Sequence, residues 1–117
     1  MLKIIEKDNK KVAIMALSGD PLGEPDAELV RQKTRQIVQS KIRHVVFDMS
    51  GVRHINSAGL GGLVSAFTTL RKVGGTVQLS NVVDPVRRIF NITRLDELFP
   101  MCDSVDEAIG KWGNDSA

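Results

Sequence analysis

One short apolar run does most to limit the folds open to this chain. Residues 44–49 read His-Val-Val-Phe-Asp-Met, and a nearly continuous run of this kind is typical of a strand that is covered on both faces. Strands of that type occur mainly in parallel sheets that carry helices on each side. The run therefore predicts an α/β fold, in which the neighbouring segments supply the helices and the other strands.

The segments around this run alternate between strand and helix patterns. The predicted strands cover residues 2–7, 11–18, 44–49, 76–80 and 98–102, and the predicted helices cover residues 26–40, 57–73, 84–90 and 104–112. Turn residues between the first two strands make them a hairpin, and every later strand is followed by a helix. With right-handed crossovers, this order predicts a mixed, mostly parallel sheet of about five strands with an N-terminal hairpin and four helices.

Apolar spacing and capping residues define the helices more closely. The expected apolar stripes are Ala27, Val30, Thr34, Ile37 and Val38 on the first long helix and Leu60, Leu63, Val64, Phe67 and Leu70 on the second. Ser104 and Glu107 have the spacing of a capping box at the start of the last helix. Pro100 lacks a backbone donor, so the strand that holds it is expected at an edge of the sheet.

Length and composition indicate one globular domain that does not bind nucleic acid. With 117 residues, the chain is expected to form a single domain over residues 1–113, followed by a short tail over residues 114–117. The net charge is only +2, from 16 basic and 14 acidic residues, and the basic residues are dispersed along the sequence. One Trp, four Phe and no Tyr leave few aromatic platforms on which bases could stack.

The sequence also predicts that the chain uses no metal or cofactor and does not span a membrane. Cys102 is the only cysteine, so neither an internal disulfide nor a cysteine cluster can form, and its apolar surroundings predict a core position. The first residues lack the apolar stretch of a signal peptide. No run approaches the ~18 apolar residues of a membrane span. We therefore expect a cytoplasmic protein.

The junction around Ser57 is the strongest candidate for a functional site. An extended apolar segment gives way there to a helix, which places the hydroxyl at or next to a helix N-terminus. Such an end favours negative charge, so a phosphate on Ser57 would be tolerated by the fold. The alternative is that Ser57 only caps the helix. Similarly, Gly59, Gly61 and Gly62 either let another molecule approach the backbone or pack tightly against the protein itself.

An enzymatic interpretation of the same junction is weaker. A nucleophilic Ser57 needs a base such as His54 or His44, oriented by a third group, and no acid is evident beside His54 in the sequence. The Gly-x-Ser-x-Gly elbow is absent, because Ile55 and Gly59 flank the serine. Residues 59–62 match neither a P-loop nor a dinucleotide-binding fingerprint. We therefore predict no catalytic residues.

Several motifs together resemble the STAS domain, the fold of bacterial anti-sigma factor antagonists. The resemblance runs over nearly the whole chain and is carried by Gly19, residues 45–50 (Val-Val-Phe-Asp-Met-Ser), residues 55–61 (Ile-Asn-Ser-Ala-Gly-Leu-Gly), Gly74-Gly75 and residues 86–90 (Val-Arg-Arg-Ile-Phe). It implies that an anti-sigma factor serine kinase phosphorylates Ser57, and that a metal-dependent serine phosphatase reverses the modification. The partner-binding residues implied are Asn56, Ser57, Ala58, Gly59 and Gly61, with Asp20 and Leu22 from the loop after the second strand.

The chain departs from the family's motif at two positions beside Ser57. Asn56 stands where the family usually has Asp, and Ala58 replaces a second hydroxyl residue. Asn keeps a side chain that can bond the turn backbone but loses the charge. These departures keep open a second interpretation, in which the chain is a STAS-like scaffold in a signalling assembly or a transporter complex and is not phosphorylated.

Overall fold

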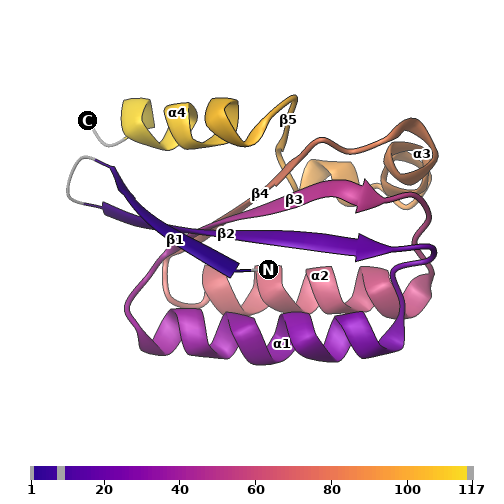
Figure 1. Cartoon of the computed structure of the whole chain (residues 1–117), viewed down its shortest axis with the longest axis horizontal. Coiled ribbons are helices and arrows are strands. Elements are labelled where there is room, and N and C mark those ends of the chain that lie inside the picture. Colours follow the sequence, from indigo (N-terminus) through magenta and orange to yellow (C-terminus); the bar gives the residue numbers. More distant parts are fainter. Residues whose placement is uncertain (1, 8–9, 116–117) are drawn as a thin grey trace.

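A computed structural model describes residues 2–7 and 10–115 of the chain (Figure 1). The strands are β1 (Leu2–Lys7), β2 (Lys10–Gly19), β3 (His44–Val52), β4 (Thr76–Ser80) and β5 (Met101–Cys102). The helices are α1 (Glu24–Gln39), α2 (Ser57–Arg71), α3 (Asp84–Ile92) and α4 (Val105–Asp115), with a 3-10 turn, η1, over Leu95–Glu97. The predicted order of strands and helices is confirmed.

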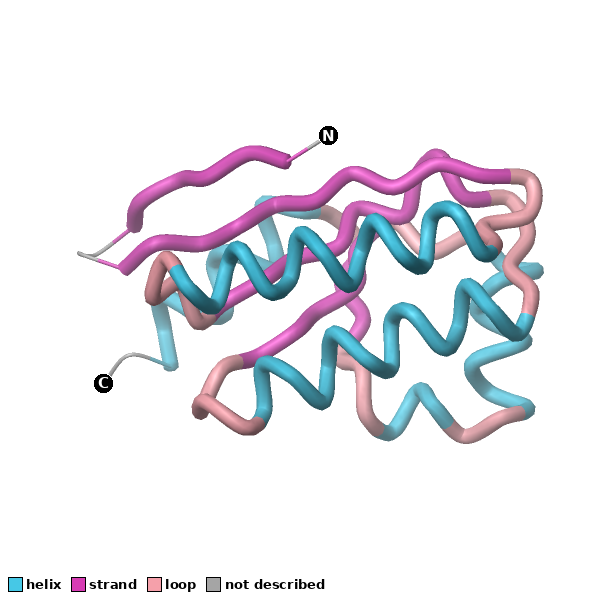
Figure 2. Tube along the Cα trace, turned by 90° about the horizontal axis from the view of Figure 1, so that it is seen from below, coloured by secondary structure: helices cyan, strands magenta, loops and turns pink. Residues whose placement is uncertain are grey.

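The five strands form one mixed sheet in the order β1-β2-β3-β4-β5. Only the β1–β2 pair is antiparallel, and the pairs β2–β3, β3–β4 and β4–β5 are parallel. Helices α1 and α2 run side by side across one face of the sheet (Figure 2), and α4 covers the other face (Figure 1). None of the helices in the described part of the chain is long and apolar enough to span a bilayer.

The central strand β3 is covered on both faces, as its apolar run predicts. Val45 and Phe47 belong to the large core cluster on the side of α1 and α2. Val46 lies between them in sequence but joins a smaller cluster with Cys102 and Ala108 on the side of α4. Because successive strand residues point to opposite faces, a nearly continuous apolar run is what a strand between two helical layers requires.

The buried face of α2 differs from the predicted stripe. Leu63 and Leu70 are buried, but Leu60, Val64 and Phe67 are only partly buried. The remaining buried positions of α2 are the small residues Gly59, Gly62 and Ala66. Small residues at these positions let α2 pack closely on its neighbours. The buried face of α2 is therefore centred on them, and the spacing of the large apolar residues did not indicate this. The stripe predicted on α1 is confirmed at Ala27, Val30, Thr34 and Ile37.

The end of the chain contains the largest error of the sequence prediction. Instead of a strand over residues 98–102, the structure has the turn η1 followed by a strand of only two residues, Met101 and Cys102. Phe99 donates its N–H to the Leu95 carbonyl and is fully buried, so this apolar segment fills the core rather than extending the sheet. The predicted edge position of the last strand is correct. Helix α4 begins as predicted, with Ser104 accepting the Glu107 N–H, and runs on to Asp115.

Candidate functional site

Two loops meet where the parallel strands β2 and β3 end. The Leu22 N–H donates to the His54 carbonyl at 2.9 Å, and the Asn56 N–H donates to the Leu22 carbonyl at 3.2 Å. The Asp20 carboxylate also bonds the His54 ring through Nδ1. The loop before α1 and the loop before α2 therefore form one unit, which sets the direction in which α2 begins.

Asn56, and not Ser57, is the N-cap of α2. Its side-chain Oδ1 accepts the Gly59 N–H at 3.0 Å, which satisfies one of the free donors at the helix start. This finding corrects the alternative in which Ser57 caps the helix. It also explains how Asn can replace the family's usual Asp here, since an amide oxygen caps the helix as a carboxylate would, without the charge.

Ser57 is the first residue of α2 and is exposed to solvent. Within residues 2–7 and 10–115, its hydroxyl has no hydrogen-bond partner. Asp20, Asn56 and Gly61 are also exposed, and Ala58 is half-buried. The Ser57 hydroxyl is thus presented on an accessible surface at the positive end of a helix dipole.

Two of the expected partner-binding residues have structural positions instead. Leu22 is only 1% exposed, and Gly59 is buried. A Cβ atom on Gly59 would overlap the Leu22 carbonyl oxygen and come within 3.0 Å of the Ile55 side chain. We therefore assign Leu22 and Gly59 to the packing that supports the site, rather than to direct contact with a partner.

The three glycines of α2 have different reasons for being glycine. A Cβ on Gly62 would lie 2.8 Å from the Ala27 Cα, so Gly62 allows the close packing of α2 on α1. Gly61 is exposed, and the nearest atom to its Cβ position is an Arg31 side-chain nitrogen at 3.9 Å. Of the three, only Gly61 leaves backbone open to another molecule, one turn along the helix from Ser57.

Alanine substitutions at Gly59 and Gly61 should affect stability in opposite directions. Gly59→Ala forces a methyl group into the Leu22 backbone and should destabilise the fold by roughly 1–3 kcal/mol, as overpacking does. Gly61→Ala places its methyl group in ordinary contact with the Arg31 side chain, without a clash, and should stabilise the helix by about 0.5–1 kcal/mol. Urea unfolding followed by circular dichroism measures both. Equal effects at the two positions would contradict the assigned packing.

Asp48 links the end of β3 to Asn81, the residue that follows β4. Its carboxylate accepts hydrogen bonds from the Ser50 N–H at 3.1 Å and from the Asn81 side-chain amide at 3.0 Å. Burial alone would raise the pKa of Asp48, but the hydrogen bonds from Asn81 and Ser50 outweigh it and hold the pKa below its usual value. An ionised Asp48 thereby supports Asn81, whose backbone lies in the left-handed region with φ 57°.

A hollow of about 370 Å³ lies near the carboxyl ends of β3 and β4, on the same side of the domain as Ser57. It is lined by Ser50, Arg53, His54, Val83 and Pro85. Of these residues, only His54 is a candidate site residue from the sequence, as a catalytic base. Their common signal is that they lie at or beyond the ends of the neighbouring parallel strands β3 and β4, where ligand sites of α/β sheets gather.

For the enzymatic interpretation, the structure supplies an acid beside His54, namely Asp20, but no base bonded to Ser57 within the described residues. Asp20 pairs with His54, a partner that the sequence did not reveal, yet both side chains are more than half exposed, at 60% and 64%. His44 lies at the opposite edge of the sheet, 2.8 Å from the Thr76 hydroxyl. Neither histidine bonds Ser57 in the described part of the chain, which also holds no group of three or more His, Cys, Asp and Glu residues suited to a metal.

Comparisons with known proteins agree with this architecture. The model of the STAS domain family matches residues 4–108. An anti-sigma F factor antagonist from Paenibacillus polymyxa is 25% identical over 109 residues, which cover 92% of each chain. The phosphorylated Bacillus cell fate determinant SpoIIAA has a TM-score of 0.70 at 20% identity, over 95% of this chain and 98% of that one. A sulfate transporter family protein from Wolinella succinogenes has a TM-score of 0.78 at 20% identity, over 90% of this chain and 88% of that one.

The match to the family model spans almost the whole of the described sheet and its helices. It includes the two loops at the ends of β2 and β3 and the start of α2, where Ser57 is exposed. The resemblance inferred from the sequence motifs is thereby confirmed, and the chain belongs to the STAS domain family.

Proposed function

We propose that this chain is an anti-sigma factor antagonist that acts in the bacterial cytoplasm. In its unmodified form it binds an anti-sigma factor that is also a serine kinase, and so regulates transcription without contacting DNA. Phosphorylation of Ser57 by that kinase switches binding off, and a metal-dependent serine phosphatase restores it. The observation that carries the proposal is the exposed Ser57 hydroxyl at the start of α2, without a hydrogen-bond partner in the described residues.

The geometry at Ser57 suits a modification that changes binding without unfolding the domain. A phosphate would add about −1.5 to −2 charges at a helix N-terminus, whose dipole and free N–H groups favour an anion. The surface for the partner then consists of Asp20, Asn56, Ser57, Ala58 and Gly61. A partner that fits a neutral hydroxyl among these residues would instead meet a dianion, next to a carboxylate that is already there.

Relatives support the same reading. The Paenibacillus polymyxa relative is an anti-sigma F factor antagonist, and the SpoIIAA structure that shares this fold carries a phosphate. Capping by Asn56 shows that loss of the family's usual Asp leaves the start of α2 intact. The exposed hydroxyl of Ser57 on this helix turn supports its proposed role as the phosphorylated group.

A second candidate is a scaffold role in a transporter complex or another signalling assembly. The similarity in fold to a sulfate transporter family protein favours it, as do Asn56 and Ala58, which depart from the motif of phosphorylated family members. Under this reading Ser57 stays unmodified, and binding depends on surfaces that a charge at position 57 does not disturb.

Phosphorylation in extracts of the native host separates the two candidates. The purified chain is incubated with host lysate and ATP, recovered, and analysed by intact-mass spectrometry and fragmentation. We expect a single added phosphate on Ser57 in the wild type and none in Ser57→Ala. An unchanged mass, or a phosphate that persists in Ser57→Ala, would refute the proposed switch and favour the scaffold role.

A further inference from the structure

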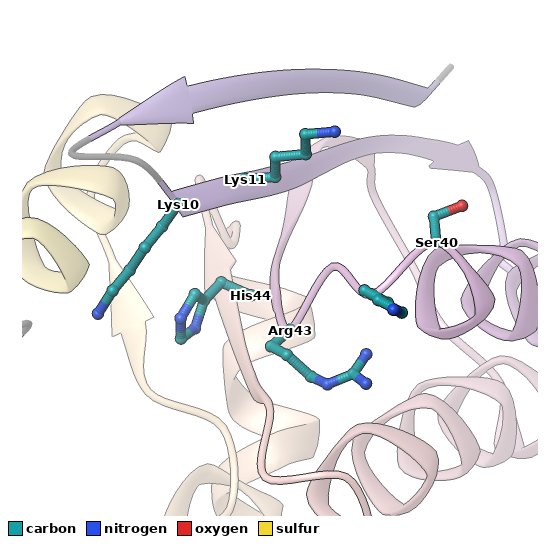
Figure 3. Close-up of a pocket in the computed structure, with 6 residues that line it drawn as sticks. Lys10, Lys11, Ser40, Arg43 and His44 are labelled. Carbon is teal, nitrogen blue, oxygen red and sulfur yellow. The ribbon is translucent and has the colours of Figure 1, made fainter.

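A basic hollow lies at the edge of the sheet opposite to Ser57, where β2 and β3 begin and α1 ends (Figure 3). Its volume is about 520 Å³, and it is lined by Lys10, Lys11, Ser40, Lys41, Arg43 and His44. In the sequence these cations lie in two separate segments, Lys10-Lys11 and Lys41 with Arg43, so no single run of charge marks the hollow. The return of the chain from α1 to the start of β3 brings both groups to one place.

The basic hollow concentrates positive charge in a nearly neutral protein. Four of its six lining residues carry a full positive charge and none is acidic, whereas the whole chain has a net charge of only +2. Glu6 stands opposite Lys11 in the register of β1 and β2, but within the described residues the four cations take part in no ion pair. Among the described residues, no acidic side chain within ion-pair distance balances these four charges.

Arg43 gives the basic hollow a fixed donor. Its Nη1 atom donates to the carbonyls of Val38 and Ile42 at 3.1 and 3.2 Å, which holds the half-buried side chain against the end of α1. These bonds occupy one end of a guanidinium that has further N–H groups to offer. A planar guanidinium held in this way matches the oxygens of a phosphate better than a mobile ammonium does.

His44 is a partly buried lining residue that lies close to Lys10. Partial burial and, next, the nearby Lys10 ammonium lower the pKa of the His44 imidazole. Figure 3 shows the Lys10 side chain extending alongside the His44 ring. A lowered pKa favours the neutral imidazole, so the positive charge of the hollow comes from its lysines and Arg43.

We propose that the basic hollow binds a small oxyanion of the phosphate class that carries two or more negative charges. Its volume lies within the range of roughly 300–1,000 Å³ typical of small-molecule sites. A multiply charged anion matches several ammonium groups and one guanidinium, because lysines act as point charges while arginine orients the oxygens. The hollow lies where β2 and β3 begin, and Ser57 lies beyond the end of β3. This inference therefore does not depend on the proposed switch.

Calorimetric titration of the whole chain with inorganic pyrophosphate tests the proposal. The pocket variant is Lys11→Gln with Lys41→Asn, which removes two exposed cations and keeps Arg43 at the end of α1. Asn suits position 41 because its backbone φ is 64°. The control variant is Arg88→Gln with Arg94→Asn, which removes two exposed cations elsewhere, one of them also at positive φ, 61°. Urea unfolding checks that both variants fold.

We expect one pyrophosphate per wild-type chain, binding at least ~10-fold weaker in the pocket variant, and little changed binding in the control. A second arm compares vesicles of phosphatidylglycerol with vesicles of phosphatidylcholine. Vesicle binding that only the pocket variant loses, without pyrophosphate binding, would support the same site with a lipid headgroup as the source of phosphate. The proposal is overturned if neither probe binds the wild type, or if the control variant weakens binding as much.

Discussion

Ser57→Asp should abolish capture of the partner from host lysate, while Ser57→Ala should leave it intact. A fixed negative charge at the start of α2 meets a binding surface that accepts a neutral hydroxyl, and it adds to the exposed Asp20 carboxylate in the adjoining loop. Repulsion or desolvation of an unpaired charge costs several kcal/mol in such an interface. At ~1.4 kcal/mol for each factor of ten, a loss of about a hundredfold in affinity is expected.

A charge placed elsewhere on the same helix provides the control. Thr68 is exposed on α2 and lies about three turns from Ser57, roughly 16 Å along the helix axis. Quantitative mass spectrometry of the captured proteins should find the same partner with the wild type, Ser57→Ala and Thr68→Asp, and not with Ser57→Asp. If all four capture it equally, charge at position 57 does not control binding.

Phe99→Ala should cost about 3–5 kcal/mol of stability, as the truncation of a buried phenylalanine usually does. Phe99 is fully buried and contacts two other rings, Phe67 at 5.4 Å and Phe90 at 5.7 Å between centroids. This residue connects the end of the chain, where η1 and β5 lie, with α2 and α3. Since domains of this size are stable by only about 5–15 kcal/mol, one substitution should remove a large part of the total.

The matched control for this prediction is Ile92→Ala, on α3. Ile92 is 71% exposed, so its truncation should change the unfolding free energy by no more than about 0.5 kcal/mol. Urea unfolding of both variants, followed by circular dichroism, gives the comparison. A loss at Phe99 as small as that at Ile92 would mean that the ring is not part of the core.

Local patterns predicted the elements of this fold more accurately than they predicted its packing. Strands β1 and β4 begin and end where the sequence places them, because apolar and β-branched residues with turn residues on each side act over a few positions. The segment before Met101 misled the prediction, since Phe99 is as suitable for a strand as for the core. Whether Phe99 extends a strand or fills the core depends on its contacts with Phe67 and Phe90, which come from other elements of the chain.

The candidate site shows the same division. The sequence placed Ser57 at the start of a helix, and the resemblance to the STAS family implied that Asp20 and Asn56 belong to the same surface. It did not reveal that Asn56 is the cap, that Asp20 pairs with His54, or that Leu22 and Gly59 are buried. The Asn56 cap is a local bond to Gly59, but the other facts require the loops after β2 and β3 to lie together. That contact is made by residues more than thirty positions apart, such as Asp20 and His54.

The sequence by itself determined the α/β class, the order of the strands and helices, and the position of a hydroxyl at the start of α2. These properties follow from short-range periodicity, from capping chemistry and from the dipole of a single helix. Only the tertiary structure decided which glycines pack inside, which residues surround Ser57, and that Lys10, Lys41 and Arg43 share one hollow. Parallel strands bring distant segments together at their ends, and no local pattern records which side chains meet there.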